Sequence, residues 1–151
     1  MAGNILLKGY TAAISTKLST ELNSLADAAT TALSAEIDNS SALDTLADFQ
    51  LDLASVTISS TTALCTIYIV PTVDGTNYPD WGSSTYGNYN AQYAVGTILV
   101  KNVSAAAARA NLTRVPLPPG KFKVALRNST GAALASSGNT LGMRTYAASY
   151  T

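Results

Sequence analysis

The chain has 151 residues, a length typical of one domain, and its nine basic and nine acidic residues give a net charge of zero. Zero net charge offers no electrostatic attraction for nucleic acid or anionic lipid, and the absence of histidine removes the side chain that most often transfers protons or binds metal. A single cysteine excludes an intramolecular disulfide framework. Hydrophobic residues make up 47% of the chain and charged residues only 12%, about half the usual share. The composition favours a protein that works through its surface, so we expect no enzyme and no cofactor.

The N-terminus carries no predicted targeting segment. Its apolar run covers only residues 5–7, and no basic stretch precedes it, whereas a signal peptide needs roughly 7–15 apolar residues after a basic start. The longest apolar segment, residues 63–70, is much shorter than the ~20 residues that span a bilayer. We expect a soluble chain made in a cytoplasm, without contact to a membrane.

Between residues 18 and 37, apolar residues recur every three or four positions, the spacing of one face of a helix. The stripe consists of Leu18, Leu22, Leu25, Ala29, Ala32 or Leu33, and Ile37. Its second half is rich in alanine and buries too little surface to hold a helix alone. The sequence therefore predicts an N-terminal arm, residues 1–43, whose α-helix contacts a partner through Leu18, Leu22, Leu25 and Ile37.

After residue 43 the apolar period changes from about 3.6 to 2, which predicts strands. The predicted strands begin at Phe49 and continue in residues 63–70, 93–103, 121–127 and 140–150, whereas residues 104–110 are also compatible with a helix. Turn signals separate these segments, because Gly and Asn tolerate positive φ. Short strands and frequent turns predict a mainly β protein, an antiparallel β-sandwich over residues 44–151. Cys65 alternates with apolar residues and is expected to be a buried, inert thiol.

The connection over residues 71–92 is the most informative candidate site, since it interleaves aromatic residues with Gly, Asn and Ser. Its aromatic residues are Tyr78, Trp81, Tyr86 and Tyr89. Tyr and Trp are enriched in recognition surfaces because they offer a large contact area at low entropic cost. Three interpretations stay open: a protein-contact loop, a platform for stacking sugars, or rings that fold back and cover the sandwich.

The acidic residues suggest no metal or catalytic site. Asp74 and Asp80 flank a Gly-containing turn and could bind a cation, but their spacing matches no calcium loop, and Asp74 is better explained by an Asx turn. Asp44, Asp48 and Asp52 recur every fourth residue, and we interpret them as a solvated acidic edge.

Charge is distributed unevenly along the chain. All nine acidic residues lie at or before residue 80, whereas seven of the nine basic residues lie beyond residue 100. No nucleic-acid motif accompanies the basic half, so the asymmetry favours self-association or docking on an acidic neighbour.

Three segments carry a resemblance to a known class of proteins: residues 46–53 (LADFQLDL), 67–78 (IYIVPTVDGTNY) and 117–123 (LPPGKFK). Together they make residues 44–130 similar to small virion structural proteins of tailed bacteriophages. The resemblance implies a jelly-roll-like β-sandwich that sits on the capsid as a decoration (cement) protein.

The leading hypothesis is therefore a non-enzymatic subunit that is assembled in the host cytoplasm and stabilises the phage head. Its expected partners are copies of itself and the major capsid protein or other virion proteins. The alternatives are a tail or neck structural protein, or a carbohydrate-binding module that uses the aromatic residues of the 71–92 connection.

Overall fold

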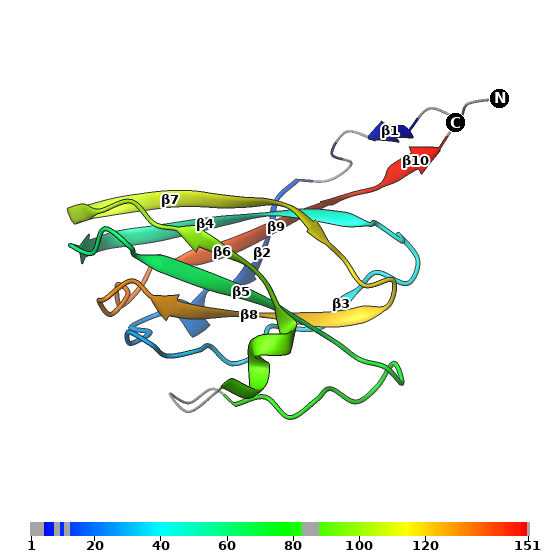
Figure 1. Cartoon of the computed structure of the whole chain (residues 1–151), viewed down its shortest axis with the longest axis horizontal. Coiled ribbons are helices and arrows are strands. Elements are labelled where there is room, and N and C mark those ends of the chain that lie inside the picture. The colour runs from blue at the N-terminus through cyan, green and yellow to red at the C-terminus, as the bar shows by residue number, and fades with distance from the viewer. Residues whose placement is uncertain (1–4, 8–9, 11–12, 83–87, 151) are drawn as a thin grey trace.

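The computed structural model describes residues 5–7, 10, 13–82 and 88–150 of the chain (Figure 1). Two four-stranded antiparallel sheets face one another, which confirms the predicted mainly β sandwich. The first sheet has the order β2 (Ser15–Leu18), β9 (Thr140–Tyr146), β4 (Leu46–Ile58), β7 (Val103–Pro116). The second sheet has the order β3 (Ile37–Asp38), β8 (Lys121–Ser129), β5 (Leu64–Pro71), β6 (Ala94–Leu99).

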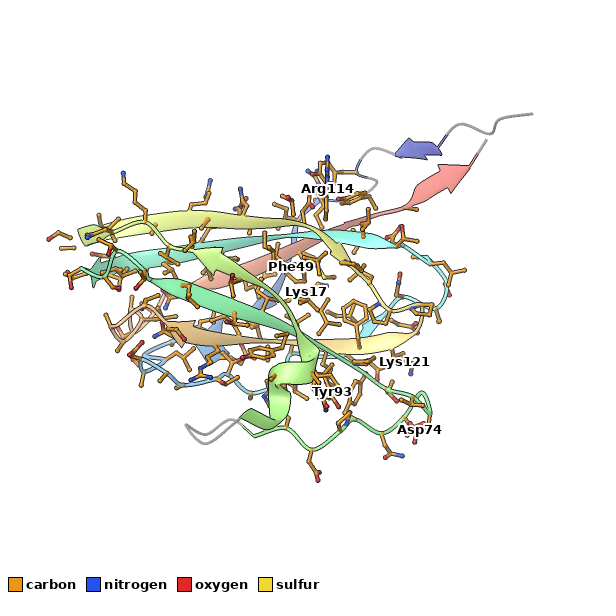
Figure 2. All side chains as sticks on the ribbon, viewed as in Figure 1. Lys17, Phe49, Asp74, Tyr93, Arg114 and Lys121 are labelled. Carbon is orange, nitrogen blue, oxygen red and sulfur yellow. The ribbon has the colours of Figure 1, made fainter. Side chains whose placement is uncertain are left out.

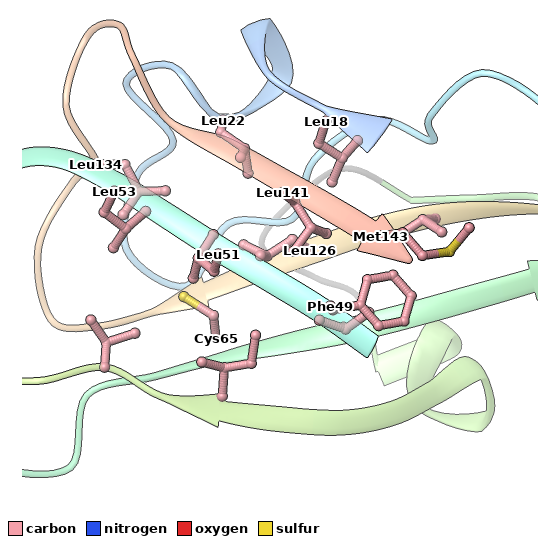
Figure 3. Packing of buried hydrophobic residues seen from close by; sticks show 14 of the residues in the cluster. Leu18, Leu22, Phe49, Leu51, Leu53, Cys65, Leu126, Leu134, Leu141 and Met143 are labelled. Atoms are coloured by element: carbon pink, nitrogen blue, oxygen red, sulfur yellow. The ribbon is translucent and has the colours of Figure 1, made fainter. Parts of the chain in front are cut away.

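A single apolar core lies between the sheets (Figure 3). From the first sheet, Phe49 and Leu51 of β4 and Leu141 of β9 point into it, and they alternate with polar residues as a half-buried strand requires. From the second sheet, Cys65 of β5 and Leu126 of β8 meet them. The shared core follows directly from the period-2 pattern of the sequence.

Part of the second sheet, the later half of β5, is buried on both faces. Tyr68 and Val70 of β5 are buried but lie outside the shared core, because they alternate with the core residues Ile67 and Ile69. Figure 1 shows residues 72–82 and the 3-10 helix η2 (Asn88–Tyr93) on the side of this sheet that faces away from the first. This cover explains why the β5 segment is apolar at almost every position.

The predicted N-terminal helix is wrong. Among the described residues, the 18–37 segment contains no α-helix and only one 3-10 turn, η1 (Thr20–Leu22). Ser24 and Ala28 have φ values of 53° and 62°, which an α-helix does not allow. Leu18 ends β2 and Leu22 ends η1, and both are buried in the shared core (Figure 3). A strand followed by a tight turn thus produces the same four-residue spacing of leucines as a helix.

The rest of this segment runs along the free edge of β8. The hydroxyls of Thr31 and Ser34 accept hydrogen bonds from the backbone N–H groups of Leu126 and Val124, at 3.1 and 2.9 Å. In return, the N–H groups of Thr31 and Ser34 donate to the carbonyls of the same two residues. Ile37 then pairs with Phe122 in β3. Irregular backbone therefore covers a sheet edge that would otherwise be open to pairing with other chains.

Residues on both sides of the predicted boundary at residue 43 belong to the same two sheets. β2 pairs with β9 and β3 with β8, so the segment from Ser15 to Asp38 is part of the sandwich. Leu25 and Ile37, predicted to contact a partner, are partly buried against the core of their own chain.

Residues 104–110, whose sequence is also compatible with a helix, belong to the strand β7. Ala105 and Arg114 have φ values of 46° and 60°, and the pairing of β7 with β4 shifts register near both. Their N–H groups donate to the side chains of Thr57 and Asp48 on β4, at 3.0 and 2.8 Å. Two β-bulges with side-chain acceptors thus twist this long edge strand, a common protection of exposed edges.

The two chain ends meet outside the sandwich. β1 (Ile5–Leu7) and β10 (Ala148–Tyr150) form a separate antiparallel pair, which we call the terminal ribbon. Figure 1 shows the terminal ribbon projecting from one end of the sandwich, near the end of β9.

Candidate interaction surface

One end of the sandwich collects the features expected of a contact surface. It comprises the connections 39–45, 72–78 and 117–120 and the terminal ribbon, and we call it the ribbon end (Figures 1 and 2). Backbone bonds join the connections: Thr72 donates to the Lys121 carbonyl at 3.1 Å, and Leu117 to the Thr45 carbonyl at 3.0 Å. The three connections therefore form one continuous surface.

The 72–78 connection is a rigid turn built on Asp74. The Asp74 carboxylate accepts hydrogen bonds from the N–H groups of Thr76 and Asn77, from the Asn77 amide and from the Thr72 hydroxyl, at 2.7–2.9 Å. These bonds hold the pKa of Asp74 far below its usual range, the largest contribution coming from the Asn77 N–H. This geometry confirms the predicted Asx turn. It also leaves Val73, beside Asp74, 100% exposed.

The 39–45 connection is fixed by a buried asparagine. The Asn39 amide donates to the carbonyls of Asp44 and Pro118, both at 2.8 Å, and its oxygen accepts the Asp44 N–H at 3.0 Å. Leu43, held with a φ of 50°, is 56% exposed. Asn39 thus ties two connections together, and the second of these contains Pro118 and Pro119, whose rings restrict the backbone.

The root of the terminal ribbon is also fixed. The hydroxyls of Tyr10 and Tyr146 both donate to the Asp48 carboxylate, and the two rings meet edge to face at a centroid distance of 5.5 Å. The Arg144 guanidinium lies over the Tyr10 ring, 4.2 Å from its centroid. The bond to Asp48 raises the pKa of Tyr10, and burial followed by the nearby Asp48 charge raises that of Tyr146.

Exposed apolar side chains gather on this half of the molecule. Among the residues whose side chains the structure describes, five large hydrophobic residues are exposed: Tyr10, Ile14, Leu43, Val73 and Leu99. Leu43 and Val73 lie on the ribbon end itself, Tyr10 lies at the ribbon root, and Ile14 packs over Gly142 of β9. Only Leu99, at the end of β6, lies at the opposite end. Exposed apolar residues on connections that hydrogen bonds hold in place are suited to protein contacts, because little entropy is lost when they bind.

An open pocket of about 140 Å³ adjoins this surface, between the sheet edges formed by β2 and β3. Buried Phe122 and Met143 lie at its apolar base, and Ala42 of the 39–45 connection lines it. Lys17 also lines the pocket, and burial lowers the pKa of its ammonium group. Within the described part of the chain, Lys17 forms no hydrogen bond and no ion pair.

The predicted aromatic site residues that the structure describes pack on their own sandwich. The Trp81 indole N–H donates to the Thr31 carbonyl at 2.9 Å, and its ring meets the Tyr68 ring edge to face at 5.4 Å. The Tyr78 hydroxyl donates to Glu36 at 3.0 Å. Burial and then the bond to Glu36 raise the pKa of Tyr78 to about 12. For Trp81 and Tyr78 the structure thus favours the third interpretation, rings that cover the sandwich, over a free sugar platform.

Two other predicted site residues add little to this comparison. Tyr86 lies outside the described residues, and Tyr89 is part of the 3-10 helix η2. Sequence reasoning missed the exposed apolar residues, of which Val73 is the most exposed. The Asp74-Gly75 turn signal could have identified it, since an apolar residue at the start of a tight turn has no core to enter.

The charge asymmetry along the chain is partly compensated within the fold. Arg109 of β7 pairs with Asp52 of β4, and Lys121 pairs with Glu36 at 2.9 Å. Burial opposes ionisation of Asp52, but the bonds from Arg109 and Gln50 outweigh it and lower the pKa of its carboxyl group. Antiparallel pairing thus brings acidic early strands beside basic late strands.

Cys65 is buried as predicted, and burial raises the pKa of its thiol to about 12. The described residues contain no group of three or more metal-ligating side chains. In the same part of the chain, no helix is long and apolar enough to cross a membrane.

No protein-family model and no curated protein matches the sequence.

Proposed function

We propose that this chain is a non-enzymatic structural protein of a bacteriophage virion, a capsid decoration (cement) subunit that binds its neighbours through the ribbon end. The observation that carries the proposal is the ribbon end itself. Val73 is exposed on a connection that hydrogen bonds to Asp74 hold in place, and Leu43 is exposed on one that Asn39 holds in place. The terminal ribbon projects from the same end. Such preorganised apolar surfaces lose little conformational entropy on assembly.

The strand order supports a jelly roll as the form of the sandwich. Counted within the two sheets in chain order, the first sheet joins the first, eighth, third and sixth strands, and the second joins the second, seventh, fourth and fifth. Two interleaved Greek keys in eight strands give this order in jelly rolls, an architecture of many viral capsid and lectin domains. This architecture supports the proposed virion role.

A carbohydrate-binding role for the 71–92 connection receives less support. Sugar stacking needs an open aromatic face, whereas Trp81 is half-buried against Tyr68 and bonded to Thr31. A structural protein of the tail or neck could use the same ribbon end. The labelling experiment below distinguishes a location in the tail or neck from one on the head.

The test is electron microscopy of phage particles labelled with an antibody raised against the purified chain. Labelled heads are the expected result. Label confined to tails or necks would move the protein to that part of the virion, and particles without any label would contradict a virion role.

A further inference from the structure

The outer face of the first sheet carries an open pocket of about 200 Å³ beside the root of the terminal ribbon. Side chains of neighbouring strands meet there. Gln50 of β4 lies opposite Asn111 of β7, and Asp48 of β4 lies opposite Arg144 of β9. These residues alternate with core residues of the same strands, so their side chains belong to the solvent side of the sheet.

The pocket has an apolar wall. Ile14 packs over Gly142 of β9, where the absence of a side chain leaves room for it, and Tyr10 lines the same pocket. The two residues are 46% and 52% exposed. A ligand whose C–H groups cover these side chains would remove apolar surface from water.

The charges at the pocket balance. Among the described residues that line it, Asp48 and Arg144 are charged, and they are of opposite sign. The Asp48 carboxylate already accepts hydrogen bonds from the two hydroxyls at the ribbon root and from the Arg114 N–H. The Arg144 guanidinium lies over the Tyr10 ring. The pocket therefore has no excess of either charge to attract an ion, which favours an uncharged ligand.

The hydrogen-bonding groups that remain available are also uncharged. Within the described part of the chain, the exposed side chains of Asn111 and Thr113 form no hydrogen bond. The Gln50 amide donates to Asp52 at 2.7 Å, which leaves the amide oxygen of Gln50 able to accept. Amides and hydroxyls together offer both donors and acceptors, so they match a ligand whose own groups do both. Hydroxyl groups have this property.

We propose that this pocket binds a neutral sugar ring of a glycan. The sugar hydroxyls bond to Gln50, Asn111 and Thr113, and the C–H groups of the ring contact Tyr10 and Ile14. Because Gln50 and Asn111 are direct cross-strand neighbours, their amides can bond neighbouring hydroxyls of one ring. The inference goes beyond the proposed virion role and does not rest on it.

The rest of the glycan has a surface to lie on. A second open pocket, of about 380 Å³, follows on the same face of the sheet, at Asp52 and Arg109. The hydrogen bond from Gln50 to Asp52 joins the two pockets. Asp52 and Arg109 form an ion pair, so this second pocket also carries balanced charge.

A glycan array tests the proposal on the purified chain and its variants. The chain should bind at least one neutral glycan, and binding should change little when salt is raised, because salt screens charged ligands. Asn111→Ala and Thr113→Val should each weaken that binding by about 3- to 10-fold, the effect of a lost hydrogen bond. Both residues are exposed, so the melting temperature should stay that of the parent chain.

Two controls show whether the signal comes from this pocket. Asn102→Ala changes another exposed asparagine, outside the pocket, and should leave glycan binding unchanged. Trp81→Phe should also leave it unchanged, since Trp81 lies on the second sheet against Tyr68. Binding of no glycan, binding of anionic glycans alone, or a signal that Asn111→Ala and Asn102→Ala reduce equally would overturn the proposal. Antibody labelling of virions depends on none of these results, so the two proposals can fail separately.

Discussion

Leu22→Ala is the substitution that best separates the observed fold from a helical arm. Leu22 is 0% exposed and belongs to the core between the sheets. Truncation removes three carbons, worth about 2.4 kcal/mol at ~0.8 kcal/mol each, and the cavity left behind brings measured Leu→Ala losses to about 2–5 kcal/mol. We expect the free energy of unfolding to fall by about 3 kcal/mol. For a chain of this length the melting temperature should then fall by about 6–12 °C.

The assay is equilibrium unfolding in guanidinium chloride, followed by circular dichroism. The transition midpoint should fall while its slope stays constant, because the substitution changes stability and not the surface exposed on unfolding. Leu43→Ala is the matched control: Leu43 is 56% exposed, so its truncation should stay within about 0.5 kcal/mol of the parent. If Leu22→Ala changed the stability by less than about 0.5 kcal/mol, Leu22 would lie on an arm outside the core, and the described N-terminal fold would be refuted.

Four further predictions follow from particular contacts. Asn128→Ala should cost about 3 kcal/mol in the same unfolding assay, because the buried amide donates to three carbonyls and its oxygen accepts two hydrogen bonds; a loss below about 1 kcal/mol would contradict this. Trp81→Phe should cost about 1 kcal/mol through the lost bond to the Thr31 carbonyl, and a glycan array should show no sugar signal that depends on Trp81. Native Cys65 should react with a thiol reagent at pH 8 at least about 100-fold more slowly than the unfolded chain. The pKa of the Cys65 thiol is about 12 in the folded chain and 9.0 in the unfolded chain. The thiol's contribution to stability is therefore complete below pH 9 and is lost between pH 9 and 12. An NMR titration of the Asp74 carboxyl should give a pKa well below 3.8. The hydrogen bonds to the carboxylate then stabilise the fold fully above pH 3.8, and this stabilisation is lost as the pH falls through the lowered pKa. A pKa at or above 3.8 would contradict the turn geometry.

The strands after residue 43 could be predicted because their signal is local. Along β4, Phe49, Leu51 and Leu53 alternate with polar residues, and this alternation alone places one face in the core. Along β5 almost every position is apolar, which indicates a strand covered on both faces. Neither pattern requires knowledge of what lies opposite.

The N-terminal segment could not be predicted in this way, because tertiary contacts decide its structure. Its leucines fit a helix, but Leu18 and Leu22 reach one core from a strand and a tight turn. Thr31 and Ser34, polar residues within the same segment, form hydrogen bonds with the edge of β8. Local propensity is a weak prior when long-range bonds of this kind are available.

The candidate site was predicted only in part for the same reason. An aromatic-rich connection indicates recognition, but whether its rings face solvent depends on distant residues: Trp81 meets Thr31 and Tyr68, which lie 50 and 13 positions earlier in the chain. The acidic and basic halves of the sequence suggested contacts between copies. Antiparallel pairing uses part of that asymmetry within one chain, as the pairs Arg109–Asp52 and Lys121–Glu36 show.

Amide hydrogen exchange, measured on the isolated chain and on the chain assembled in its particle, decides whether the ribbon end is the contact surface. Assembly should slow exchange in residues 39–45 and 72–78 and at Leu117 and Gly120, and it should leave the connections at the opposite end, 59–63 and 130–139, unchanged. Protection confined to the opposite end, with the three ribbon-end connections exchanging as in the isolated chain, would contradict this prediction.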